Sequence, residues 1–271
     1  MSRWRLVVMV AATACYIPLM LLADSWDPVR QAVLALATAG FLYWLVRFGR
    51  VPGVQVTWAI LLASAGEIGA SVLWGIYRYR YAAIPFYVPF GHGIFYALAL
   101  RTSVEEALRR HARAIVRTVV IAGSVYGAMS LVLLHDVTGL LWWIGAALLM
   151  TRSESGLLMA ACCVYTVALE WTGTTIGNWR WSSVVPYLGI PSANPPCGVG
   201  FVYCLVDIST VAICRSGAMT RLVDRLRYAD ERLCGSRGRH GITSVGLALR
   251  DLVGAFASVR GDARAEGATR S

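Results

Sequence analysis

Two stretches of the chain read alike, and they decide how the rest is interpreted. Residues 67–79 read EIGASVLWGIYRY, and residues 170–181 read EWTGTTIGNWRW. Each has a glutamate and, seven or eight positions later, a Gly-x-aromatic-Arg-aromatic motif. A second pair follows in the same order: residues 89–96 read PFGHGIFY and residues 196–203 read PCGVGFVY, which share Pro-x-Gly-x-Gly-x-x-Tyr. Ordered self-similarity of this kind predicts an internal repeat.

The hydropathy pattern places this repeat in a membrane. Of the 271 residues, 57% are hydrophobic and only 15% are charged, whereas a soluble domain carries about a quarter charged residues. The apolar blocks are long enough to cross a hydrocarbon core of about 30 Å. We therefore expect an all-α integral membrane protein of about eight transmembrane helices, with predicted spans at 6–23, 31–47, 55–76, 84–100, 115–134, 137–151, 156–177 and 197–214. No small-residue cleavage site follows the first block, so we interpret it as a retained helix rather than a signal peptide.

The repeat divides these helices into two groups of four. An even number of helices gives both copies the same orientation, so the repeats should be parallel, related by an axis along the membrane normal. The predicted units are 1–101 and 102–215. A basic, amphipathic tail, 216–271, would follow on the membrane surface, cap the bundle or be disordered.

The arginines predict the orientation. A net charge of +10 is compatible with nucleic-acid binding, but the arginines lie between alternate apolar blocks, as the positive-inside rule describes. We therefore expect a multi-pass protein of the cell membrane with both termini cytoplasmic, in contact with membrane lipids and not with nucleic acid. The arginines assigned to the cytoplasmic side are Arg3, Arg5, Arg47, Arg50, Arg101, Arg109, Arg110, Arg113, Arg117, Arg152 and those of the tail.

Four polar residues within the spans are candidate catalytic groups: Glu67, Glu170, Asp207 and His92. A carboxyl group in hydrocarbon is costly, so it usually faces the protein interior and has a function. Burial favours its protonated form, which would make a proton donor available. His92 lies between two glycines and could relay a proton. The alternative for each of the four is a structural hydrogen bond between helices.

Aromatic residues accompany the glutamates in both halves. Trp and Tyr are typical of membrane interfaces, but their ring faces also stabilise cations, so they could surround a carbocation. Proline-rich residues 184–196 are expected to fold back as a lid over the outer mouth. The predicted substrate-binding residues are Trp74, Tyr77, Tyr79, Tyr96, Trp171, Trp179, Trp181, Asn194 and Tyr203.

Several motifs are absent from the sequence. It has no Walker loop, GxGxxG, HExxH, GxSxG or CxxC motif, and no DDxxD cluster that would hold magnesium against a diphosphate. We assign Glu105 and Glu106 to a solvated, arginine-rich linker helix. The sequence therefore predicts no metal, no other cofactor and no ionisation of an allylic diphosphate.

Residues 170–181 resemble the Glu-x-x-Gly-x-x-x-Gly-x-aromatic-x-aromatic stretch of integral-membrane carotenoid hydratases and cyclases. The general plan also resembles the small membrane terpene cyclases of bacterial and fungal meroterpenoid pathways. The resemblance implies that intramembrane acids protonate an alkene or epoxide, with roles for Glu170, Glu67 and Asp207.

We therefore expect an enzyme that cyclises a lipophilic isoprenoid held between the two repeats. Three alternatives remain open: a small proton-coupled transporter or lipid-binding protein, a carotenoid hydratase or cyclase, and a structural subunit that binds a partner protein.

Overall fold

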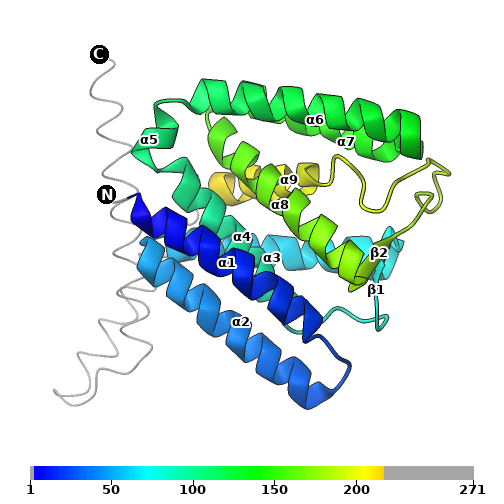
Figure 1. Ribbon diagram of the computed structural model, residues 1–271, viewed down its shortest axis with the longest axis horizontal. Helices are drawn as coiled ribbons and strands as arrows, with labels where there is room; N and C mark the ends of the chain where they lie inside the picture. The colour runs from blue at the N-terminus through cyan, green and yellow to red at the C-terminus, as the bar shows by residue number, and fades with distance from the viewer. Residues whose placement is uncertain (1–2, 217–271) are drawn as a thin grey trace.

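The computed structural model describes residues 3–216, so the predicted tail lies outside the described residues except for Ser216. The described part is mostly helical (Figure 1). Its elements are α1 (Trp4–Leu22), α2 (Pro28–Gly49), α3 (Gly53–Glu67), the π-helix η1 (Ile68–Trp74), β1 (Tyr77–Tyr79), α4 (Val88–Ser103), α5 (Glu106–Arg109), α6 (Ala112–Leu134), α7 (Val137–Arg152), α8 (Gly156–Ile176), β2 (Trp179–Trp181) and α9 (Gly200–Arg215).

The length and composition of the helices make this a membrane-embedded protein. Within the described residues, five helical segments are long and apolar enough to cross a membrane: α1, α2, α3 together with η1, α6 and α8. α7 is apolar but shorter, with 16 residues. Large apolar side chains on α1, α2 and α6 are exposed, among them Leu36 and Val132. These faces suit contact with lipid rather than water.

The helices lie close to the predicted spans, and two of them begin later than predicted. The span predicted at 84–100 begins at Val88, where Pro89 stands in the first turn, a position that proline favours. The span predicted at 197–214 begins at Gly200. In both places a turn that starts at a proline precedes the helix, with the amide of Val88 bonded to the carbonyl of Pro85 and the amide of Val199 to that of Pro196.

The two glutamate-containing stretches end in a short two-stranded ribbon that the sequence did not predict. β1 pairs antiparallel with β2, with Tyr77 opposite Trp181, Arg78 opposite Arg180 and Tyr79 opposite Trp179. Gly75 ends η1 and Gly177 ends α8, with φ of 75° and 82°, which only glycine adopts without strain. These two equivalent glycines turn the chain from each helix into the ribbon.

The π-helix η1 explains the unequal spacing of the two stretches. Glycine follows glutamate by eight positions in the first stretch and by seven in the second. A π-helical segment accommodates an extra residue within a helix without ending it. Glu67 therefore keeps the same place relative to the ribbon as Glu170, each about two turns before its helical segment ends, at Trp74 and at Ile176.

α4 lies at the centre of the bundle, in contact with α1, α2, α3 and α8. Its side chains from His92 to Arg101 are all buried. α6 and α7 pack together along one edge, and α1 and α2 form the opposite edge (Figure 1). α8 and α9 pack on each other, and α9 also contacts α3.

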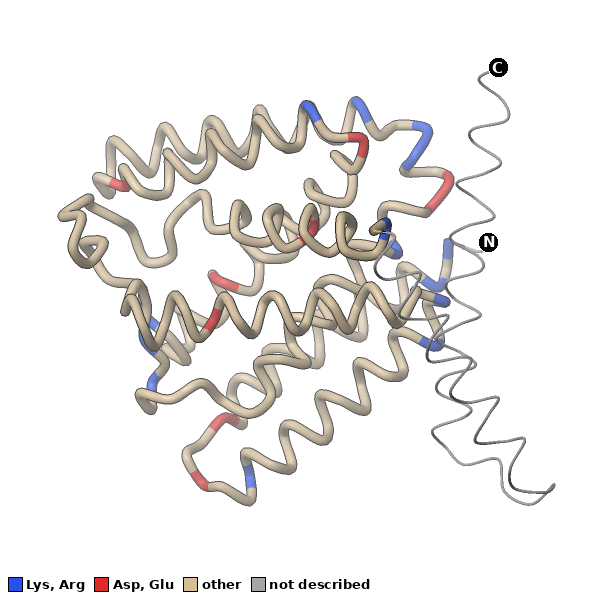
Figure 2. Tube along the Cα trace, turned by 180° about the vertical axis from the view of Figure 1, so that it is seen from behind, with Lys and Arg blue, Asp and Glu red and all other residues tan. Residues whose placement is uncertain are grey.

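The charged residues collect at the two ends of the bundle. One end carries most of the arginines, and the middle contains few charges (Figure 2). One expectation at this end was wrong: Glu105 is not solvated but 4% exposed, and it pairs with the buried Arg101 at 2.5 Å. Glu106 is exposed as expected and pairs with Arg110.

Residues 182–199 form a hairpin-like loop held by Asp136. This carboxylate is fully buried, and it accepts hydrogen bonds from the amides of Gly139, Ala193 and Cys197 at 2.9, 3.0 and 2.7 Å, and from Ser130 Oγ at 3.0 Å. Asp136 thus caps the N-terminus of α7 and fixes the loop to it.

Candidate active site

A cavity of about 310 Å³ lies beneath the ribbon, inside the helical bundle. Its walls come from α1, α3, η1, β1, α4, α7, α8, β2 and α9. Most of the lining side chains are apolar or aromatic, and the ionisable groups among them are Glu67, Glu170, His92 and the tyrosines. Its size is near the lower end of the range for small-molecule sites, about 300–1,000 Å³.

Glu67 is at the centre of a polar network. Its Oε2 accepts hydrogen bonds from the hydroxyls of Tyr77 and of Tyr79, the latter at 2.7 Å. Its Oε1 lies 3.1 Å from Nε2 of His92, and Nδ1 of His92 shares a hydrogen bond of 2.9 Å with the hydroxyl of Tyr203. Burial, and next the Glu67 carboxylate, raise the pKa of Tyr77 and of Tyr79. Both hydroxyls therefore keep their protons and act as donors.

Glu170 has a simpler environment. Its Oε2 accepts hydrogen bonds from the indole nitrogens of Trp179 and Trp181 at 2.8 and 2.9 Å. The side chain is 7% exposed and lines the cavity. No cation or base of residues 3–216 is bonded to it. An indole N–H can only donate, so this carboxyl group lies among apolar walls with two donors on one oxygen.

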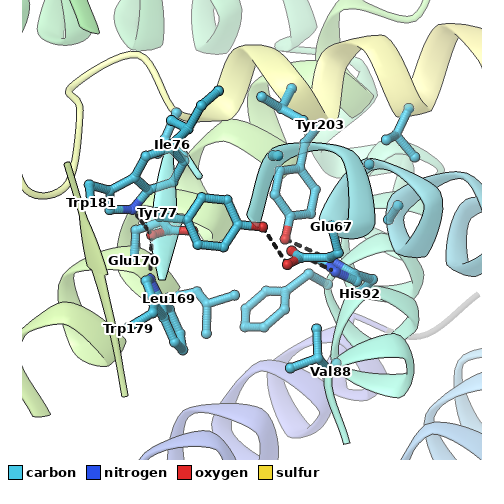
Figure 3. A pocket seen from close by; sticks show the side chains of 18 of the residues that line it. Glu67, Ile76, Tyr77, Val88, His92, Leu169, Glu170, Trp179, Trp181 and Tyr203 are labelled. Atoms are coloured by element: carbon cyan, nitrogen blue, oxygen red, sulfur yellow. Dashed lines mark hydrogen bonds and ion pairs between the residues drawn. The ribbon is translucent and has the colours of Figure 1, made fainter. Parts of the chain in front are cut away.

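The ribbon thus supplies the donors for both acids, each strand serving the glutamate that precedes it. In Figure 3 Tyr77 extends from the ribbon between the two carboxyl groups, with its hydroxyl toward Glu67 and its ring beside Trp181. The ring centroids of Tyr77 and Trp181 are 4.6 Å apart. Equivalent residues of the two stretches therefore perform equivalent tasks.

Two helices contribute to the walls in a way that the sequence did not indicate. Trp142 of α7 lines the cavity and packs edge-on against Trp181, with ring centroids 5.9 Å apart. Met20 and Leu21 of α1 also line it. Both helices lack polar residues at these positions, so no sequence signal distinguished them from lipid-facing segments.

Six of the nine predicted substrate-binding residues and three of the four candidate catalytic residues line the cavity. They are Glu67, Glu170 and His92, with Trp74, Tyr77, Tyr79, Trp179, Trp181 and Tyr203. The indole of Trp74 also donates to the carbonyl of Pro186 at 3.0 Å.

Two of the predicted site residues, Asp207 and Tyr96, do not line the cavity. Asp207 is 1% exposed and accepts a hydrogen bond from Cys162 Sγ at 3.4 Å. It follows Tyr203 by one turn, on the same face of α9, and so lies further along the helix than the part that lines the cavity. Tyr96 is buried at 2% exposure, one turn beyond His92 on α4.

Trp171, Asn194 and the proline-rich loop also differ from expectation. Trp171 is 53% exposed and donates to the hydroxyl of Tyr126 at 3.3 Å, because it follows Glu170 directly and so points about 100° away from it around α8. Asn194 accepts a hydrogen bond from the amide of Trp181 at 2.8 Å and so holds the ribbon. Within the described chain, no residue of 182–198 lines the cavity, so this loop braces the ribbon rather than covering the cavity.

Among residues 3–216, no group of three or more His, Cys, Asp and Glu side chains is arranged to hold a metal ion. The arrangement of paired acids, a histidine and aromatic walls suits acid–base chemistry on an apolar molecule.

Comparison of the chain with protein-family models, with curated proteins and with solved structures finds no match.

Proposed function

We propose that this protein is a membrane-bound terpene cyclase, which protonates a lipophilic isoprenoid and does not ionise a diphosphate. The observation that carries the proposal is the cavity itself: two carboxyl groups in a partly open, largely apolar space with aromatic walls. An isoprenoid enters such a space from the lipid phase, and the aromatic faces stabilise the carbocation that protonation creates.

In this proposal Glu170 is the proton donor. Both of its hydrogen bonds come to Oε2, which leaves Oε1 to carry a proton toward the cavity. Apolar surroundings without a cationic partner favour the neutral acid. Transfer of that proton to an alkene carbon, or to an epoxide oxygen, forms the cation that the remaining double bonds attack.

Glu67 has the complementary role. Two tyrosine hydroxyls and His92 surround it, and three such groups stabilise a carboxylate. A carboxylate at this place stabilises the cation electrostatically and accepts the proton lost in the last step. The product is then an isomer of the substrate, with one proton added and one removed.

The proposed architecture is two parallel four-helix repeats, 1–101 and 102–215, with both termini cytoplasmic. The ribbon register supports it, because equivalent segments pair about a local two-fold axis between Arg78 and Arg180. The concentration of arginines at the opposite end of the bundle supports the orientation (Figure 2).

The test is turnover of prenylated aromatic and epoxidised isoprenoid substrates by the purified protein in lipid nanodiscs. Glu170→Gln and Glu67→Gln should each reduce turnover by about 10²–10⁴-fold, the usual contribution of a general acid or base. Glu106→Gln removes an exposed glutamate and serves as the matched control, with unchanged turnover. Full activity in both cavity variants would contradict the proposal.

The paired acids also suit a proton-coupled transporter, since such proteins place substrate and ion sites at the interface of internal repeats and relay protons through intramembrane acids. Substrate flux across proteoliposomes without chemical conversion, abolished by the same two variants, would favour this second function.

A further inference from the structure

The outer face of the ribbon carries two arginines side by side. Arg78 and Arg180 are directly opposite in the antiparallel register, so their side chains project from the same face, with Cβ atoms about 5 Å apart. Tyr77, Tyr79, Trp179 and Trp181 occupy the other face and are buried, whereas both arginines are exposed.

Two like charges in directly opposite positions destabilise a strand pair. Among the described residues, neither Arg78 nor Arg180 has an acidic partner within ion-pair distance. Arg80 differs from them, because its guanidinium donates to the carbonyls of Ile176 and Gly177 at 2.6 and 3.0 Å and caps α8. The pair on the ribbon therefore presents two uncompensated positive charges at one point.

The position of the ribbon identifies the environment of this pair. The segments Gly53–Trp74 and Gly156–Ile176 have 22 and 21 residues, about 30 Å of helix each, which is the thickness of the hydrocarbon core. The ribbon begins three residues after each segment, so it lies at the level of the headgroups. Trp74 and Trp171 are 41% and 53% exposed near the same helix ends, as is typical of interfacial tryptophans.

We propose that Arg78 and Arg180 bind the phosphate of one membrane-lipid headgroup between them. Two guanidinium groups offer forked pairs of donors that match the geometry of phosphate oxygens, and the anion removes the repulsion across the ribbon. Because the other face of the ribbon donates the hydrogen bonds to Glu67 and Glu170, the bound lipid also holds the donors of both acids in place.

Lipid binding to the purified, delipidated full chain tests this without any assay of turnover. Native mass spectrometry would follow titration with phosphatidylglycerol. Arg78→Gln and Arg180→Gln should each weaken binding by roughly tenfold or more, since each removes a charge-assisted hydrogen bond. Arg30→Gln is the matched control, an exposed arginine at the start of α2, and should bind as the unaltered chain does.

Further measurements distinguish a lipid phosphate from free phosphate, and lipid binding from a purely structural role of the two arginines. A glycolipid with the same acyl chains but no phosphate should bind equally weakly to all four proteins. Inorganic phosphate that binds as tightly as the phospholipid would overturn the assignment to lipid. Without lipid, Arg78→Gln and Arg180→Gln should be at least as stable as the unaltered chain, because the repulsion between the two arginines is removed. A loss of stability in the delipidated variants would show that the arginines have a structural role and would overturn the proposal.

Discussion

Replacement of Gly173 by alanine should disturb the site through a single methyl group. A Cβ at this position would lie 2.0 Å from Cη2 of Trp179, whereas carbon atoms in contact are about 3.5–4.0 Å apart. The indole would have to retreat by about 1.5 Å. Its Nε1 would then leave hydrogen-bond range of Glu170 Oε2, from which it is 2.8 Å distant in the structure.

The expected magnitude follows from three contributions. Overpacking costs about 1–3 kcal/mol, and the lost hydrogen bond costs about 1 kcal/mol. Alanine has a higher helix propensity than glycine, which offsets about 1 kcal/mol of this loss. Gly173→Ala should therefore destabilise the protein by about 1–3 kcal/mol.

Gly40→Ala provides the control. Gly40 lies within α2 with no atom within 4 Å of its would-be Cβ, so this variant should be stabilised by about 1 kcal/mol. The measurement is unfolding in mixed detergent micelles, followed by circular dichroism. In a Trp179→Ala background the obstacle is gone, and Gly173→Ala should also become stabilising. Equal stability changes for the two glycine variants, or a Gly173 effect that persists without Trp179, would refute the packing argument.

Three further predictions concern groups outside the cavity. Asp136→Ala should lower the free energy of unfolding in micelles by about 3–5 kcal/mol, because it leaves buried amides without an acceptor. Asp27→Ala removes an exposed cap at the start of α2 and should cost only about 1 kcal/mol. Similar losses for the two variants would contradict the role of Asp136 in holding the loop. Glu105→Gln should lower the free energy of unfolding by about 3 kcal/mol, since it leaves a buried arginine unpaired. The exposed control Glu106→Gln should lower it by less than about 0.5 kcal/mol. Equal effects in the same assay would count against a stabilising buried ion pair. Burial, and then Asp136, raise the pKa of Cys197 to about 12, so this thiol should resist iodoacetamide at pH 9 in the folded protein; alkylation there as fast as in detergent-unfolded protein would be the contrary result.

Much of the helical architecture could be predicted from the sequence, because apolar blocks of sufficient length have few alternatives to helix in a membrane. The observed helices begin and end within a few residues of the predicted spans. Glu67 and Glu170 could also be singled out, since carboxyl groups in apolar blocks are conspicuous. Their shared cavity with His92 followed from the equivalence of the two stretches.

The remaining features depend on contacts between distant segments. The ribbon pairs strands of three residues that lie a hundred positions apart, and three residues are too few to show an alternating pattern. Trp142 reaches the cavity only because α7 packs beside α9. Whether Asp207 reached the cavity depended on how far the cavity extends along α9, which the apolar sequence of this helix does not define.

The ribbon has a consequence for how the two halves of the chain depend on each other. A strand of three residues has no stability of its own, so neither half could form its own set of donors without a second strand opposite. In the proposed repeat, a single copy would have had to associate with an identical copy through a two-fold, isologous contact. Once both copies belong to one chain, their sequences no longer have to be identical. One half can then carry His92 where the other has Val199, and the other can carry Asp207 where the first has Leu100.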